Sequence, residues 1–235
     1  MNKIRLHIRG QMGVQILQTF VALSRLQPDE TPVIYVNTKG LGPNFHNRLH
    51  DVFMPQFETL EQDEIRKTPY WETGCAASVF KTRDHTLNVW MLPKPISFST
   101  VFPEIILHCR GGDKPVATAE SIVSLYRDAS AHLTDQRTVR IISDDENLAK
   151  AVANEIPGAK YNVDTAINDW QRMLTAESII AMPSAYVSSI LMCNPNKDII
   201  FGGPTYCDGG YPASHGDLLF LSEAAEFCPN LKIYG

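Results

Sequence analysis

The chain has 235 residues, of which 44% are hydrophobic and 20% are charged, with a net charge of −5 and a pI near 5.8. A chain of this length buries a sizeable core, and its acidic balance without a Lys/Arg-rich run excludes a general nucleic-acid binder. Its five cysteines are scattered without a zinc-type spacing, and no apolar run is long enough to span a membrane. We therefore expect a cytoplasmic protein with reduced thiols and no signal peptide.

The first residues predict a strand, a tight glycine turn and a helix. Residues 3–8 alternate polar and apolar side chains, and Leu17, Phe20 and Val21 then recur at helical spacing. Between them, Gly10 and Gly13 permit a tight turn, and a glycine-rich first turn often faces a nucleotide or a sugar. Because the glycine motif is incomplete, a plain tight turn is the simpler interpretation.

The stretch from residue 30 to residue 100 is less informative. Residues 33–37 predict a strand, residues 38–47 a loop and residues 57–67 a short acidic surface helix. Trp71, Phe80 and Trp90 are isolated aromatic residues and are better explained as core than as sugar-stacking groups. Prolines bracket residues 94–102, which suits a crossing between two halves of the chain, residues 1–100 and 101–235.

Strands and helices alternate regularly in the second half. We expect strands at 105–109, 139–143, 160–163, 178–181 and 199–201, and helices at 119–131, 146–155, 165–176, 184–192 and 217–227. This alternation predicts a parallel, Rossmann-like sheet. In such a sheet ligands bind beyond the carboxyl ends of the strands, so the residues at those ends are the candidates for a site.

The strand 105–109 ends in the most informative stretch, His108-Cys109-Arg110-Gly111-Gly112-Asp113. Arginine supplies a planar fork of donors, and two glycines let the backbone approach a ligand, so this stretch suits a phosphate. The alternative is structural: Arg110 pairs with Asp113, and His108 is a satisfied core histidine.

The next strand ends in Ser143-Asp144-Asp145. One carboxylate can cap the following helix, while the other hydrogen-bonds the base or ribose of a nucleotide. Metal binding is a weaker alternative, because adjacent side chains point apart on extended backbone. Two later strands are also followed by such residues, Pro183-Ser184 and Gly202-Gly203-Pro204. Four strands in total therefore end in polar or glycine-rich residues, which together favour a nucleotide-type site.

Blocks of the chain, taken in order, resemble the α-1,2-fucosyltransferases and, more loosely, the superfamily with α-1,6- and protein O-fucosyltransferases. Residues 10–15 are similar to the family's G-G-x-G-N-Q turn, residues 108–113 to its H-x-R-R-G-D, and residues 141–145 to a strand ending in S-D-D. Residues 179–186 resemble its last block, I-I-A-N-S-S-F-S-W-W, and residues 200–204 the strand and proline that follow.

This resemblance implies a compact α/β enzyme of the GT-B-like type, with two Rossmann-like halves built on parallel sheets. Residues 1–100 would form the acceptor side and residues 101–235 the donor side. The resemblance also implies inversion at the anomeric carbon, no metal and no cofactor beyond the donor itself. The implied donor-binding residues are Gly10, Gly13, His108, Gly111, Gly112, Ser143, Asp144 and Ser184, with Arg110 on the diphosphate.

The chain departs from the family pattern at informative positions. Gly111 replaces the second arginine, Val14 replaces an asparagine, and Val187 and Ser188 replace two tryptophans. The phosphate-binding arginine is retained, so the departures bear mainly on the identity of the sugar and the base.

The mechanism expected from these residues is metal-free transfer. Arg110 stabilises the leaving diphosphate, and Asp113 is the first candidate for the catalytic base, with Glu72, Asp51 and Asp208 as alternatives. The leading hypothesis is transfer of a 6-deoxyhexose, from GDP-fucose first, to a glycan hydroxyl. The alternatives are another transferase, such as one using UDP-rhamnose, and a non-catalytic protein that binds a nucleotide sugar or a glycan.

Overall fold

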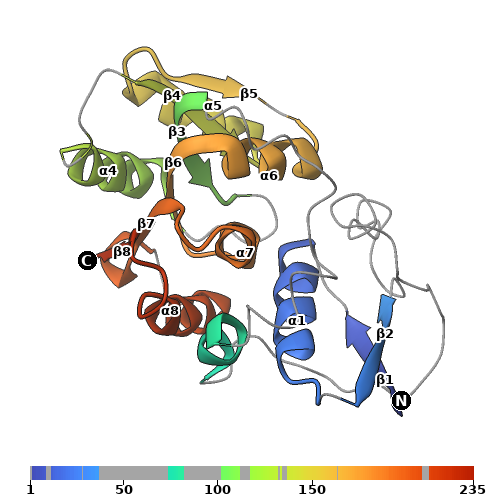
Figure 1. The fold of residues 1–235 in the computed structure, drawn as a ribbon. Helices are drawn as coiled ribbons and strands as arrows, with labels where there is room; N and C mark the ends of the chain where they lie inside the picture. Colours follow the sequence, from blue (N-terminus) through green and yellow to red (C-terminus); the bar gives the residue numbers. More distant parts are fainter. Residues whose placement is uncertain are drawn as a thin grey trace.

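The computed structural model describes residues 2–8, 12–27, 29–36, 74–81, 102–111, 117–131, 133, 137–162, 164–207 and 212–235. Its centre is a six-stranded parallel sheet (Figure 1). The strands are β3 (Phe102–Cys109), β4 (Thr138–Ser143), β5 (Lys160–Asn162), β6 (Ala176–Ala181), β7 (Asp198–Gly202) and β8 (Leu231–Tyr234). They lie in the order β5-β4-β3-β6-β7-β8.

Helices follow the strands, as the alternation in the sequence predicts. They are α4 (Ala119–Ser130), α5 (Glu146–Glu155), α6 (Ala166–Thr175), α7 (Ala185–Cys193) and α8 (Pro212–Ala224), with a short 3-10 turn η1 (Pro204–Tyr206) after β7. The five expected strands and five expected helices are confirmed, with ends that differ by up to five residues. The sixth strand, β8, was not expected.

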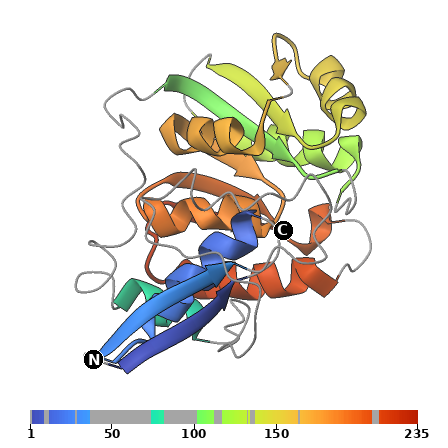
Figure 2. The ribbon, with the colours of Figure 1, turned by 90° about the vertical axis from the view of Figure 1, so that its right-hand side faces the viewer.

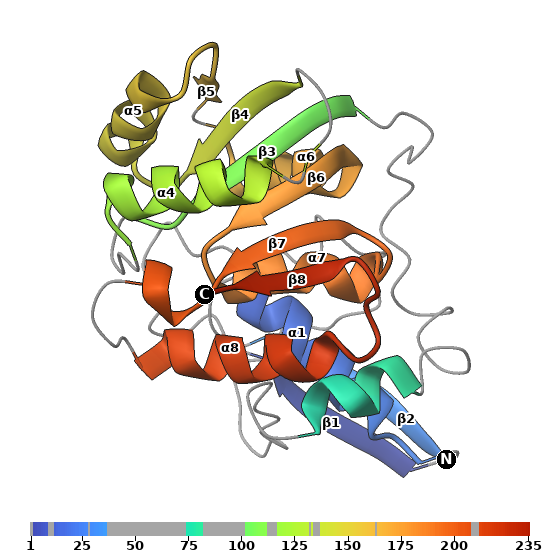
Figure 3. The same cartoon turned by 90° about the vertical axis from the view of Figure 1, so that its left-hand side faces the viewer.

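The central strands β3, β4, β6 and β7 are largely buried on both faces, which explains their apolar runs, whereas the edge strand β5 is exposed. Ile105 and Leu107 of β3 pack with α4 and α5, whereas Ile106 lies in a second core with α1, α6, α7 and α8. Figure 3 shows α4 and α5 in front of the sheet. His108 follows Ile106 by two residues and therefore points toward the α6 and α7 face.

The N-terminal region contributes a second, smaller sheet. Strand β1 (Asn2–Ile8) pairs in parallel with β2 (Glu30–Val36), and helix α1 (Met12–Ser24) connects them. Figure 2 shows this pair of strands apart from the six-stranded sheet. The strand expected at 33–37 starts earlier, at Glu30, and includes Pro32, which a strand at the edge of a sheet tolerates.

Helix α1 lies within the first half of the sequence but is buried against the second. Its residues Ile16, Leu17 and Phe20 belong to the same core as Trp170 and Phe220. A helix over 75–81, which the sequence did not indicate, lies beside α1 and α8 (Figure 3).

The helix over 75–81 is held by side chains from both neighbours. Glu223 of α8 accepts hydrogen bonds from the backbone N–H groups of Gly74 and Ala76, and Ser24 of α1 donates to Ser78 at 3.2 Å. Phe80 packs at the edge of the core and stacks on Phe227 at 5.8 Å, which confirms the core interpretation of this aromatic residue. No helix in the described ranges is long and apolar enough to cross a lipid bilayer.

Candidate functional site

The order of the strands marks one position as the natural ligand site. The chain moves outward from β3 through β4 to β5, then returns to the other side of β3 and continues outward through β6, β7 and β8. This is the strand order of the doubly wound dinucleotide-binding fold, in which ligands bind where the direction reverses. The reversal lies between β3 and β6, where His108 is paired with Ala181.

The turn after β3 is tied to the turn after β4. The backbone N–H of Gly111 donates to Oδ1 of Asp144 at 2.8 Å. Asp145 caps α5, as expected of one of the two carboxylates, and accepts from the N–H groups of Asn147 and Leu148 at 2.9 and 3.1 Å. Ser143, which is buried, accepts the N–H of Asp145 at 3.0 Å. The strands that precede these turns, β3 with His108 near its end and β4 just before Asp144, are neighbours in the sheet.

Gly111 has no room for a side chain. A Cβ built on Gly111 would lie 2.5 Å from Cβ of Asp145, which its capping bonds hold in place. In this structure, glycine at position 111 lets the turns after β3 and β4 lie in contact, and a side chain there would force them apart.

His108 is buried but is not a satisfied core histidine. Its side chain is 6% exposed, and its Nδ1 atom has no hydrogen-bond partner among the described residues. Its ring lies 5.5 Å from the ring of Tyr186, tilted by 37°. Burial, with a smaller contribution from the charge of Arg110, lowers the pKa of His108 to about 3. The imidazole is therefore neutral at ordinary pH, and its buried Nδ1 lies at the strand end next to the reversal point without a partner among the described residues.

Arg110 directly follows β3 and is half-buried. Its guanidinium is close enough to affect His108 electrostatically, so the two groups occupy one region. The proposed partner Asp113 lies outside the described residues, as do the predicted donor-binding residues Gly10 and Gly112. The other candidate bases, Glu72, Asp51 and Asp208, also lie outside them.

Ser184 caps α7, and Gly13 approaches the first turn of the same helix. Ser184 is 1% exposed, and its hydroxyl caps α7 by accepting the N–H of Val187 at 3.3 Å. A Cβ on Gly13 would lie 2.4 Å from the backbone of Tyr186, so glycine permits α1 to touch α7 here. Both residues thus have structural roles, and their contact with a donor remains a prediction.

Asp169 is a candidate that the sequence analysis missed. This carboxylate is in the first turn of α6 and is only 7% exposed. Burial raises its pKa to about 6, with the neighbouring charge of Asp164 adding to the rise and Arg172 opposing it. Asp169 lies four residues before Met173 on the apolar face of the helix, and that placement was a signal in the sequence. A buried carboxylate near a ligand position is a marker of function.

The fold can be compared with solved structures. A crystal structure of the α-1,6-fucosyltransferase NodZ soaked with GDP-fucose matches 88% of this chain and 97% of its own, at a TM-score of 0.53 and 13% identity. The selenomethionine form of NodZ from Bradyrhizobium matches 89% of this chain and 98% of its own, at a TM-score of 0.52 and 11% identity. The chain has a GT-B-like fold. No family model and no curated protein matches the sequence.

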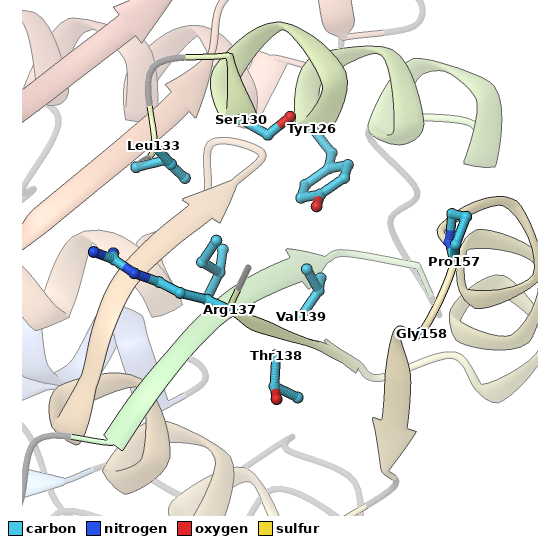
Figure 4. A pocket seen from close by; sticks show the side chains of 9 residues that line it. Tyr126, Ser130, Leu133, Arg137, Thr138, Val139, Pro157 and Gly158 are labelled. Carbon is cyan, nitrogen blue, oxygen red and sulfur yellow. The ribbon is translucent and has the colours of Figure 1, made fainter. Parts of the chain in front are cut away.

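This GT-B-like chain also has a hollow at the other end of its sheet. The hollow, of about 370 Å³, is lined by residues near the amino ends of β3 and β4, and Tyr126 points into it from α4 (Figure 4). Arg137, at its edge, forms an ion pair with Glu177 at 2.8 Å. None of the predicted site residues lines it, and its position opposite the carboxyl ends separates it from the candidate site.

Proposed function

We propose that this protein is a glycosyltransferase that binds a nucleoside-diphosphate sugar between the ends of β3 and β6. It transfers a 6-deoxyhexose, fucose first, to a glycan hydroxyl. The observation that carries the proposal is the buried, neutral His108 beside Arg110 at the reversal of strand order. The likeness in fold to an enzyme whose crystal was soaked with GDP-fucose supports the choice of donor.

The chemistry assigned to Arg110 is stabilisation of the leaving group. Cleavage of the sugar–phosphate bond leaves negative charge on the nucleoside diphosphate, and a fixed guanidinium can stabilise that charge more in the transition state than in the ground state. The acceptor hydroxyl attacks the anomeric carbon with inversion, and a carboxylate, with Asp113 first, takes its proton. No metal takes part in this scheme.

Recognition of the base is assigned to His108 and Asp169. Asp144 was expected to face the base or ribose, but its Oδ1 already accepts the Gly111 N–H. Asp169 is buried and close to Tyr186, which touches His108. A carboxylate accepts the paired N–H donors of guanine more readily than the single N–H of uracil, so this assignment favours GDP. A uridine donor such as UDP-rhamnose is the alternative.

A non-catalytic, nucleotide-sugar-binding protein is the second candidate function. Two departures from the fucosyltransferase pattern favour it: Gly111 stands in place of the second arginine and Val14 in place of an asparagine. Hydrolysis of the donor without an acceptor separates the two functions, since a binder leaves the donor intact. The acceptor-side role of residues 1–100 and the cytoplasmic setting belong to the same proposal.

The first experiment is calorimetry with GDP and UDP, followed by a transfer assay with GDP-fucose. We expect GDP to bind more tightly than UDP, and Arg110→Lys to keep the fold while losing on the order of 10²-fold in transfer rate. A matched control is Arg137→Lys, at the opposite end of the sheet, which should leave transfer unchanged. Failure of both nucleotides to bind would exclude the proposed function, and full turnover in Arg110→Lys would exclude its phosphate role.

A further inference from the structure

Tyr186 connects the helices on either side of the candidate base site. It is the second residue of α7, and its ring lies against His108 at 5.5 Å. Its hydroxyl donates to the backbone carbonyl of Ala166, the first residue of α6. One side chain therefore touches the imidazole at the end of β3 and the turn of α6 that carries Asp169.

A second set of hydrogen bonds supports the same junction. Nε1 of Trp170 donates to Oγ of Ser189 at 2.8 Å, and that hydroxyl donates to the carbonyl of Tyr186 at 2.6 Å. All the groups involved belong to α6 or α7, so the two helices are fixed to each other near the carboxyl ends of β3 and β6.

The environment keeps Tyr186 in its donating form. Burial raises the pKa of its hydroxyl well above its usual value, and the charge of Asp169 adds to the rise. The phenol is therefore protonated at neutral pH and can donate its hydrogen bond.

Helix α1 also packs against the backbone of Tyr186. The close approach of Gly13 leaves α1 in direct contact with the N and Cα atoms of Tyr186. Residue 186 therefore has little freedom to shift if its side chain is changed, and a conservative substitution should report on side-chain contacts alone.

We propose that Tyr186 is a positioning residue of the nucleotide subsite. Its ring sets the plane of the His108 imidazole, and its hydroxyl fixes the α6 turn so that Asp169 faces the base. This inference rests on the proposed function, because it assigns a role within the same donor site. In this role Tyr186 contacts neither the diphosphate nor the reacting atoms and acts through His108 and Asp169.

The test compares GDP with inorganic diphosphate as calorimetric probes. Tyr186→Phe keeps the ring and removes the hydroxyl, so we expect GDP to bind about fivefold more weakly, the usual effect of one lost hydrogen bond. Binding of diphosphate, which contacts only the Arg110 side of the site, should be unchanged. In the transfer assay, KM for the donor should rise with kcat unchanged. Tyr186→Leu also removes the ring contact with His108 and should weaken GDP further.

The matched control is Thr175→Val, at the other end of α6. The Thr175 hydroxyl also donates to backbone carbonyls, of Gln171 and Arg172 at 3.1 Å, so the variant loses a similar bond away from the site. It should bind GDP like the unmodified protein.

Each further outcome is decisive. Equal GDP affinity in Tyr186→Phe and the unmodified protein would overturn the inference while leaving the proposed function intact. An equal loss for GDP and diphosphate would also overturn it, since that result indicates a general structural role. Failure of the unmodified protein to bind GDP or UDP would overturn both proposals.

Discussion

The Gly111 N–H donates to Oδ1 of Asp144, and this hydrogen bond joins the turns that follow two neighbouring strands. Through this bond, Asp144 supports the backbone of the turn at the candidate site. It also holds the backbone of the residue that follows Arg110. Substitutions at residues 111 and 144 therefore test different properties, stability at the first and binding at the second.

Gly111→Ala should destabilise the protein. The added Cβ would lie 2.5 Å from Cβ of Asp145, and relief of that clash should lower the free energy of unfolding by about 1–3 kcal/mol, measured by urea denaturation. Combining it with Asp145→Gly removes the opposing Cβ, and glycine costs a capping position only a few tenths of a kcal/mol. The double variant should thus recover much of the loss. Unchanged stability in Gly111→Ala would contradict the close contact.

Substitutions of Asp144 distinguish support of the turn from recognition of the base. Asp144→Asn keeps an Oδ1 acceptor for the Gly111 N–H, so calorimetry should give near-normal affinities for GDP and UDP. Asp144→Ala loses that acceptor and should weaken both nucleotides about tenfold, in the range for a hydrogen bond to a charged group. If Asp144→Asn instead abolishes a preference for GDP over UDP, Asp144 reads the base directly, as the sequence analysis first suggested.

Asp169→Asn should stabilise the protein at neutral pH. With its pKa raised to about 6, Asp169 holds its proton more tightly in the folded than in the unfolded state. Between about pH 4 and pH 6 the unfolded chain has lost this proton while the folded chain keeps it, so the free energy of unfolding falls as pH rises. Above pH 6 the destabilisation is complete, at about 3 kcal/mol.

The measurement is urea denaturation of both proteins at pH 4 and pH 7. Asp169→Asn should gain stability relative to the unmodified chain only at the higher pH, while its preference for GDP over UDP should decrease. The control is Asp164→Asn, an exposed neighbour whose carboxylate has a lowered pKa, which should give no such gain. A loss of stability at pH 7 in Asp169→Asn would contradict the assignment.

Transfer should persist in excess EDTA. In the proposed mechanism Arg110 and backbone N–H groups carry the charge of the diphosphate, so chelation removes nothing that the reaction needs. The same assay with calcium-saturated EDTA controls for effects of the chelator itself. Loss of activity in EDTA and its recovery with manganese would show a metal-dependent enzyme instead.

Much of the fold was predictable because the signals for it are local. Strand β3 contains the apolar run of residues 105–107, and Asp145 stands where a helix cap is expected. The errors also have local causes. Helix α8 begins at Pro212, since proline suits the first turn of a helix, whereas the prediction began at Asp217. Strand β8 was missed because it has four residues and contains Lys232 between apolar neighbours.

The site was only partly predictable. Strand ends in the sequence indicated His108, Arg110 and Asp144, because the carboxyl ends of parallel strands always meet at one edge. The roles of Tyr186 and Asp169 depend on how α6 and α7 pack against each other, and no spacing along the chain encodes that contact. The sequence did show a carboxylate, Asp169, on the apolar face of a helix. Whether that carboxylate lies at a site depends on the packing of α7 against α6, which the sequence does not show.

The burial of α1 has a consequence for the synthesis of the protein. Its apolar face is made early, yet the helix that covers it, α7, begins about 160 residues later (Ser24 to Ala185). At the usual speed of translation, that face stays uncovered on the ribosome for roughly ten to thirty seconds. The apolar face of α1 is therefore exposed during most of synthesis, and a fragment released before α7 is made would leave that face uncovered.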